Sequence, residues 1–499
     1  MGLLLMRNGQ WLFRRKWVRL SATLLFGVGL IEGTTATLAG AAVLQASLVS
    51  NTASPDSPVV NGGQCYPGVP NPAACRRVLV LVNVSSPTRN WVYAGGIIDS
   101  VTDPATKVTT TGFHNVFRFD AVTHRLDTTW KPQFYRTTTA YTDSAVTGLA
   151  SSSDGTTLFV AGTFNNVAQT TGATATARKG VAAVSTADGS VLPFNAKVCV
   201  GGGPCSVYDV KLVNGTLWLG GLFTRVQGAA VNALAFVDPV TAVLRPTQLP
   251  VAGIVTTTVG SKVHKIAVNP QATQAAMIGN FSSVGGATHK EVAVLDIAPD
   301  GTATANPWNA PSNLDASVTA CNATDTWARG IDWDPTGMYF DIAASGGGGF
   351  DAYPALCDSF TRFASNGNPN TLAPLVVNAT GFDSEFTVCD TGGLAYVGGH
   401  FKNQNHAVRI NGVIKTIPGR TNEVHYGMAA ITVDPTDANF GFAVQSWNNS
   451  ALTGRGAGWA SCLSIAGGQS VGGGVYIGGD AGNVGGNATI QRLALFTAP

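Results

Sequence analysis

Apolar and polar residues alternate in short runs along the chain. The clearest run is Thr216–Phe223 (TLWLGGLF), an apolar segment that ends in a glycine pair and an aromatic residue. Six related segments occur at Trp91–Ile97 (WVYAGGI), Thr157–Phe164 (TLFVAGTF), Ala275–Phe281 (AAMIGNF), Gly337–Ala343 (GMYFDIA), Leu394–Phe401 (LAYVGGHF) and Gly474–Asp480 (GVYIGGD). The first small residue after each apolar run recurs at intervals of 55 to 80 residues. This recurrence predicts seven copies of one supersecondary unit.

The second copy shows how one unit is built. Its apolar runs predict four short strands, at Ala145–Ser151, Thr157–Phe164, Gly180–Thr186 and Ser190–Asn195. A tight turn at Asp154-Gly155 joins the first strand to the second, and another at Asp188-Gly189 joins the third to the fourth. A longer polar loop separates the second strand from the third. Each unit is therefore expected to be an antiparallel sheet of four strands.

Seven such units predict an all-β fold, a seven-bladed β-propeller of four-stranded antiparallel blades. One four-stranded sheet cannot bury both of its faces, so each blade is expected to pack against its neighbours. The aromatic residues after the glycines are expected in the core between blades: Phe164, Phe223, Phe281 and Phe401. The chain ends soon after the third strand of the last unit, so its fourth strand is expected from the N-terminal side, around Val59–Val60.

Because successive strands run in opposite directions, the connections between them lie on two opposite faces of the predicted fold. Turns between the first and second strands, and between the third and fourth, are short and share one face. Loops between the second and third strands lie on the other face, and several are long: 98–113, 165–179, 345–356 and 402–426. Binding residues concentrate on loops that a rigid scaffold positions, so we expect any functional surface on this long-loop face.

The N-terminal residues have the order of a secretory signal peptide. Basic residues precede an apolar stretch from Leu20 to Ile31, and a small-residue segment ends at Ala41. Cleavage after Ala41 is expected. The alternative is an uncleaved anchor, in which Glu32 would be costly within a bilayer. We assign residues 1–41 to the signal peptide or anchor, 42–75 to a linker and leading strand, and 76–499 to the propeller.

The net charge of the chain bears on which class of partner it can bind. The 499 residues carry a formal net charge of +2, but five of the 30 basic side chains and one of the 28 acidic ones lie within residues 1–41. The remainder has a formal charge of −2 and no basic run, which argues against nucleic acid as a partner. Membrane contact is expected only through an uncleaved N-terminal segment.

The chain has eight cysteines, which we interpret as structural disulfides of an exported protein. They are Cys65, Cys75, Cys199, Cys205, Cys321, Cys357, Cys389 and Cys462. The short spacings of the first two pairs suit local bridges. The next two cysteines fall within one repeat, and the last two lie in neighbouring repeats. No CxxC motif occurs, which counts against a zinc site and a thioredoxin-type redox motif.

Beyond the GGxF repeats, longer motifs carry a family resemblance. They are IDWDPTGMYFDIAASGG (331–347), LCDSFTRF (356–363), YGMAAITVDP (426–435), SWNN (446–449), GVYIGGDAGNVGG (474–486) and RLALF (492–496). With these motifs the sequence resembles secreted actinobacterial propeller proteins of unknown function, related to delta-60 and kelch-like repeat proteins. The resemblance covers about residues 76–499 and implies a propeller fold and export. It supplies no catalytic residues.

Two sets of side chains are candidates for a binding site. His400, His406 and His425 fall in or beside one long loop, but their spacings of 6 and 19 residues match no metal-ligand motif, and we interpret them as solvated or structural. Aromatic residues occupy equivalent places near the ends of fourth strands: Trp130, Phe194, Trp308 and Trp447. They could stack on sugars, but packing also requires such equivalence, so we expect them in the core.

No catalytic, cofactor-binding or metal-binding residue can be assigned from the sequence. Asp99, Asp103 and Asp480 follow second strands, but no pair can be placed at the separation that a glycosidase needs. The segment Ser151–Phe159 has the composition of an Asp box, yet its residue order favours a plain turn. We therefore expect an extracellular or cell-surface binding module for a glycan or protein rather than an enzyme. The alternative is a carbohydrate-active hydrolase or lyase with carboxylates at the axial funnel.

Overall fold

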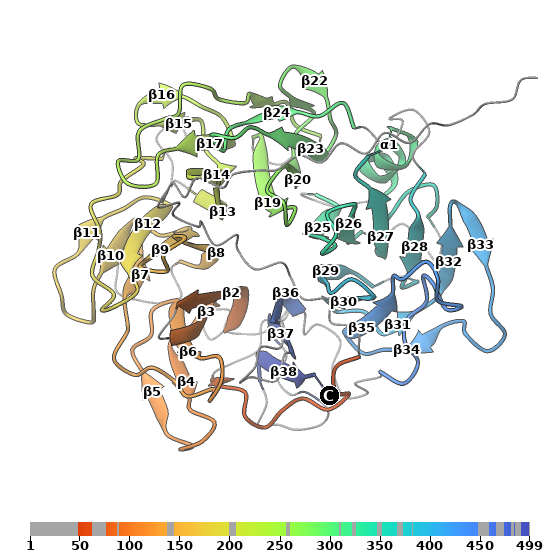
Figure 1. Cartoon of the computed structure of the whole chain (residues 1–499), viewed down its shortest axis with the longest axis horizontal. Helices are drawn as coiled ribbons and strands as arrows, with labels where there is room; N and C mark the ends of the chain where they lie inside the picture. Colours follow the sequence, from red (N-terminus) through yellow and green to blue (C-terminus); the bar gives the residue numbers. More distant parts are fainter. Residues whose placement is uncertain are drawn as a thin grey trace, which may run out of the picture. The chain divides into compact units, whose positions relative to one another are not determined.

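A computed structural model describes most of the chain beyond the N-terminal segment. The described residues are 48–61, 76–86, 89–136, 144–198, 206–255, 260–308, 311–321, 326–346, 352–366, 373–381, 383–447, 459–465, 474–480, 484 and 491–498. They form 38 strands, β1 to β38, and one helix, α1 (Pro311–Ala320). The sheets are small and every strand pairing within them is antiparallel, so the predicted all-β class is confirmed (Figure 1). The predicted signal peptide, residues 1–41, lies outside the described residues.

Seven main sheets follow one another along the chain, one for each predicted repeat. In repeats one to four they are β2 (Arg77–Ser86), β3 (Arg89–Ile97) and β6 (Val116–Asp120); β8 (Val146–Ser151), β9 (Thr157–Gly162) and β12 (Val181–Ser185); β13 (Ser206–Val213), β14 (Thr216–Leu222) and β17 (Leu234–Val237); β19 (Lys262–Val268), β20 (Gln274–Asn280), β23 (Val292–Ile297) and β24 (Ala303–Ala305). In repeats five to seven they are β25 (Ala328–Trp333), β26 (Tyr339–Ala344), β27 (Ser359–Ala364) and β28 (Val376–Ala379); β29 (Glu385–Asp390), β30 (Leu394–Gly399) and β35 (Met428–Thr432); β36 (Trp459–Ile465), β37 (Gly474–Gly479) and β38 (Leu493–Thr497). Each repeated apolar segment forms the second strand of its sheet.

The expectation of four strands in every sheet is wrong. Among the described residues, five of the seven main sheets have three strands, and only the fourth and fifth repeats supply four strands of their own. In four repeats an isolated bridge stands where the fourth strand was expected, as between Val184 and Val191 and between Val237 and Leu244. Pro193 and Pro246 follow these bridges by two residues. Proline has no N–H to donate to a sheet, so it stops the pairing there.

The long loops carry short strands of their own. Those in the first four repeats are β4 (Ser100–Thr102), β5 (Thr109–Thr111), β10 (Asn166–Ala168), β11 (Thr176–Ala177), β15 (Arg225–Val226), β16 (Ala229–Ala230), β21 (Ser283–Val284) and β22 (Ala287–Thr288). Three connecting strands pair with them: β1 (Val59–Val60), β7 (Gln133–Tyr135) and β18 (Val251–Ala252). The loop of the sixth repeat holds β31 (Asn403–Gln404), β32 (Ala407–Ile410), β33 (Val413–Lys415) and β34 (Glu423–Val424). There β32 pairs with β28, which extends the fifth sheet to six strands.

The N-terminal segment reaches the last sheet, but not through the residues expected. The backbone N–H groups of Ser50 and Ser54 donate to the carbonyls of Thr497 and Leu495, each at 2.7 Å. Val59–Val60 instead pairs with β4 in the first repeat. The predicted position of the closing segment is therefore wrong by several residues, because Val60 fits a buried place beside Val101.

The first strands of the main sheets contact one another in sequence. Strands β2, β8, β13, β19, β25, β29 and β36 each contact the next, and β36 also contacts β2. Figure 1 shows these strands toward the centre of the view, with later strands of each sheet outside them. Glycine permits the closest approaches: a Cβ on Gly330 would lie 2.7 Å from the Cα of Thr387 in β29.

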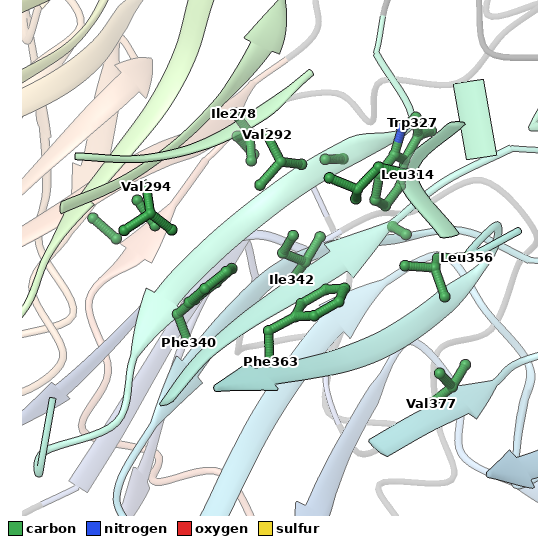
Figure 2. Packing of buried hydrophobic residues seen from close by; sticks show 14 of the residues in the cluster. Ile278, Val292, Val294, Leu314, Trp327, Phe340, Ile342, Leu356, Phe363 and Val377 are labelled. Atoms are coloured by element: carbon green, nitrogen blue, oxygen red, sulfur yellow. The ribbon is translucent and has the colours of Figure 1, made fainter. Parts of the chain in front are cut away.

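The apolar core consists of clusters that each join neighbouring repeats. Figure 2 shows one of them, where Ile278 and Val292 of the fourth repeat pack with Phe340 and Phe363 of the fifth. The repeated phenylalanines are buried as predicted, with at most 2% of their surface exposed: Phe164, Phe223, Phe281 and Phe401. Thus each sheet depends on its neighbours to cover its apolar faces.

Candidate functional site

A β-bulge interrupts the first strand of every repeat at the same place. The pairing with the second strand skips one residue near the start of β2, β8, β13, β19, β25, β29 and β36. The skipped residues are Leu79, Thr147, Tyr208, His264, Arg329, Phe386 and Ala460, and we call this set the bulge ring. A bulge adds one residue to a strand and re-aims its side chain.

The bulges lie at the end of each hairpin that opens into the long loops. In the third repeat, for example, Val207 pairs with Gly221 beside the bulge, whereas Val213 pairs with Thr216 beside the short turn. The six bulged side chains that the structure describes are partly exposed, and the residues on either side of each are buried except Lys265, which is also partly exposed. In the first six repeats, one partly exposed side chain each therefore lies at the long-loop end of the first strand.

Aromatic and basic groups are prominent in the bulge ring. The rings of Tyr208 and His264 lie 5.8 Å apart between centroids, and Lys262 Nζ lies 5.9 Å from the Tyr208 ring. Phe386 contacts the ring of His400 edge-on at 5.0 Å. Arg329 Nε donates to Ser345 Oγ at 2.8 Å. Such a mixture of flat apolar rings and hydrogen-bond donors is common in sites for polar organic ligands.

A cavity of about 490 Å³ is lined by the first strands. Its wall includes the bulge-ring residues Leu79 and Phe386, and it extends along the strands to Pro335 and Thr391 near the short turns. We call it the central cavity. Its lining is apolar at the first and seventh repeats, basic at the third and fourth, and acidic at the fifth and sixth. This volume suits a small ligand or one sugar unit of a longer one.

The basic part of the wall holds one carboxylate and two lysines. Asp209 accepts a hydrogen bond from the backbone N–H of Ile266 at 2.8 Å, which links the third and fourth sheets. Lys211 Nζ lies 3.3 Å from Asp209 Oδ1. Lys265 also borders the cavity, and burial lowers the pKa of its ammonium group, partly offset by the charge of Asp209.

The acidic part of the wall is formed by Asp332 and Asp390. The backbone N–H of Asp390 donates to Asp332 Oδ2 at 3.0 Å. Burial raises the pKa of Asp332 to about 7, and the nearby Asp390 carboxylate also raises it. Behind the wall, Arg362 Nη2 lies 2.8 Å from Asp390 Oδ2, and Arg362 Nε lies 3.8 Å from Asp341 Oδ1. Burial also raises the pKa of Asp341 well above its usual value.

The three histidines that the sequence singled out contact different partners. His400 Nδ1 lies 3.7 Å from Asp383 Oδ1, and the interaction with that carboxylate raises the pKa of His400. His406 Nδ1 is 2.6 Å from Asn422 Oδ1. His425 is buried, which lowers its pKa, and its Nε2 lies 3.5 Å from a carboxylate oxygen of Glu423. Within the described ranges, no three His, Cys, Asp or Glu side chains are grouped as metal ligands.

The aromatic residues near the ends of fourth strands are in the core, as predicted. Trp130, Phe194, Trp308 and Trp447 have at most 2% of their surface exposed. The indole N–H of Trp130 donates to Ser185 O, that of Trp308 to Ala364 O and that of Trp447 to Ser50 O. These bonds cross to the next repeat or to the N-terminal segment, so they exclude a sugar-stacking role for the tryptophans.

The remaining sequence candidates have structural contacts. Asp103 accepts backbone hydrogen bonds from Ala105 and Thr106, which fixes a turn, and also binds Arg125. Asp480 is buried, while Asp99 lies just before β4. The segment Ser151–Phe159 is the turn between β8 and β9, where Asp154 accepts hydrogen bonds from Ser152 and Thr156, so the turn interpretation is confirmed.

Two of the disulfides expected from the cysteine count are present. Cys321 pairs with Cys357 within the fifth repeat, and Cys389 pairs with Cys462 across the first strands of repeats six and seven. Cys389 and Cys462 both line the central cavity. The other expected pairs, Cys65 with Cys75 and Cys199 with Cys205, lie outside the described residues.

Sequence reasoning missed the bulge ring and the central cavity. A bulge leaves only a weak trace in one strand, a skipped step in the apolar alternation. Aligning the seven first strands with one another would have shown that step at the same place, but no single repeat reveals it. The convergence of Asp209, Lys265 and Asp332 depends on strands far apart in the chain.

The helix α1 has ten residues, and nowhere in the described part of the chain is a helix long and apolar enough to span a membrane. A comparison of the sequence with models of protein families found no match, and a comparison with curated proteins also found none.

Proposed function

We propose that the chain is an exported seven-bladed β-propeller that binds a glycan at the long-loop end of its central cavity. The seven-bladed architecture is supported by seven main sheets whose first strands contact in order, the last touching the first. Each blade has three or more strands rather than a strict four. We also propose, from the resemblance of its sequence motifs, that the chain is related to secreted propeller proteins of the delta-60 and kelch-like type.

The observation that carries the binding role is the bulge ring. The same bulge occurs in seven strands. In the six repeats where the bulged side chain is described, that side chain is partly exposed. In five of these six repeats both neighbouring residues are buried, so the bulge exposes one side chain between two buried positions. Tyr208 and Phe386 offer flat faces for sugar rings, and Arg329 offers hydrogen-bond donors for hydroxyl or carboxylate groups.

Export is supported by the N-terminal sequence pattern and by the two disulfides. Disulfides of this kind persist in oxidising compartments. Sequencing the N-terminus of protein collected outside the cells tests this part directly. We expect it to begin at Ala42, and a protein that stays in the cytoplasm with free thiols would contradict export.

Binding is tested with the purified protein on a panel of cell-wall and other polysaccharides. We expect Tyr208→Ala and Phe386→Ala each to weaken binding about fivefold, since a stacked ring contributes about 1 kcal/mol. Met338→Ala is the matched control, because Met338 is 47% exposed in the short turn at the opposite end of its hairpin. Equal binding by the wild type and the three variants would show that the ligand does not contact Tyr208 or Phe386.

A second candidate, a carbohydrate-active hydrolase or lyase, is favoured by one observation. Asp332 and Asp390 both line the central cavity, and a carboxyl group with a pKa near 7 can donate and accept protons at neutral pH. The same polysaccharide panel scores product release. Release by the wild type that Asp332→Asn abolishes, with binding retained, would favour the enzyme over the binding module.

A further inference from the structure

The sixth repeat differs from the others at a buried position of its first strand. The residue before the bulge is apolar in the other six repeats: Val78, Val146, Val207, Val263, Ala328 and Trp459. In the sixth repeat this residue is Glu385, whose surface is completely buried. A carboxylate in an apolar place is costly unless something compensates for it.

A second apolar position of the sixth repeat is also polar. Three residues after the repeated phenylalanine, the second, third and fourth repeats have Val167, Val226 and Val284, all completely buried. The sixth repeat has Gln404 there, in β31, with no exposed surface. Gln404 Nε2 donates to Glu385 Oε1 at 2.7 Å, so the two substitutions meet in space.

Asp358 of the fifth repeat completes the group. Its carboxylate accepts a hydrogen bond from Ser384 Oγ at 3.0 Å, next to Glu385 in the chain. Asp358 is 2% exposed, and its charge acts on the Glu385 carboxyl. The group therefore lies between the fifth and sixth sheets, with Glu385 in β29, Asp358 just before β27 and Gln404 in a long loop.

Each of the three side chains has a buried oxygen without a hydrogen-bond partner. These atoms are Glu385 Oε2, Asp358 Oδ2 and Gln404 Oε1. A buried carboxylate or amide oxygen that lacks a donor costs free energy comparable to a lost hydrogen bond. Three such atoms on side chains that these contacts link point to a bound cation.

We propose that Glu385, Asp358 and Gln404 bind a calcium ion between the fifth and sixth sheets. Two carboxylates and an amide carbonyl are donors that hard divalent cations prefer. Calcium accepts six to eight oxygen ligands in flexible geometry, whereas magnesium retains several of its waters, which suits a buried site less well. The ion would join the two sheets, and the site is independent of glycan binding.

The test is calcium binding by the purified full-length secreted protein after treatment with EGTA. We expect titration calorimetry to find one site and the melting temperature to rise by about 1.5 °C for each tenfold increase in calcium above the dissociation constant. Magnesium at the same concentrations should have a much smaller effect. If calcium neither binds nor changes the melting temperature of the wild type, the proposal is wrong.

Two substitutions restore the residue type that other repeats have at these positions. Glu385→Val and Gln404→Val should fold and lose the calcium response, since they remove ligands and unpartnered oxygens together. Glu385→Gln keeps the size of the side chain, and it replaces Glu385→Val as the test variant if the valine variant does not fold. Glu423→Gln is the control, because Glu423 lies in the same long loop but pairs with Arg420. A normal calcium response in all Glu385 and Gln404 variants would overturn the assignment.

Discussion

The contact between the first strands of neighbouring repeats can be tested by adding one methyl group, with the substitution Gly330→Ala. Gly330 in β25 lies against β29, and a Cβ at this position would be 2.7 Å from Thr387 Cα and 3.0 Å from Phe386 O. Ordinary contacts of a Cβ begin at 3.4 Å, so the overlap is about 0.7 Å. Because the atoms it meets are backbone, no side-chain rotation can relieve the clash.

We therefore expect Gly330→Ala to destabilise the protein strongly. Overpacking a well-filled interior costs about 1–3 kcal/mol, and a clash with backbone belongs at the upper end, near 3 kcal/mol. With an unfolding entropy of about 2.1 cal/mol/K per residue, this corresponds to a fall in melting temperature of about 3 °C. Thermal and urea unfolding, followed by tryptophan fluorescence, would measure both quantities.

Gly393→Ala is the matched control. A Cβ on Gly393, in the turn before β30, would have no atom within 4 Å, and its φ is not in the left-handed region. This substitution should stabilise the protein by about 0.5 kcal/mol, since alanine reduces the freedom of the unfolded chain. The two variants thus have opposite expected signs. A Gly330→Ala protein as stable as the wild type would refute the close packing of the fifth and sixth repeats.

Three further predictions concern stability. Replacing both cysteines of either disulfide by alanine should cost about 4 kcal/mol, because the bonds close loops of 36 and 73 residues, and unchanged urea midpoints would contradict this. Phe223→Ala should cost about 3–5 kcal/mol in the same assay, whereas a cost below 1 kcal/mol would argue against the burial of Phe223 between sheets. The raised pKa of Asp332, about 7, means that the folded state holds this proton more tightly than the unfolded state, so its contribution to stability falls as the pH rises from about 4 to 7. Asp332→Asn should show a smaller loss of melting temperature between pH 5 and pH 8 than the wild type, and identical pH profiles would contradict the assignment.

Local sequence patterns predicted the strands well and their partners poorly. The turn at Asp154-Gly155 and the strands beside it follow from residue types within ten positions, so β8, β9 and β12 were located closely. The pairing of Val59–Val60 with β4, and of β32 with β28, depends on which edges lie free once the sheets have assembled. No local pattern carries that information.

By itself the sequence determined the all-β class, the seven repeats, the buried phenylalanines and tryptophans, and the presence of disulfides, because periodicity and residue type act over short distances. Only the tertiary structure brought Asp209, Lys265 and Asp332 to one cavity, aligned the seven bulges, and placed Glu385 against Gln404 and Asp358. The physical reason is that a site is made by side chains from separate strands, and their distances are fixed only when each sheet covers the apolar face of the next.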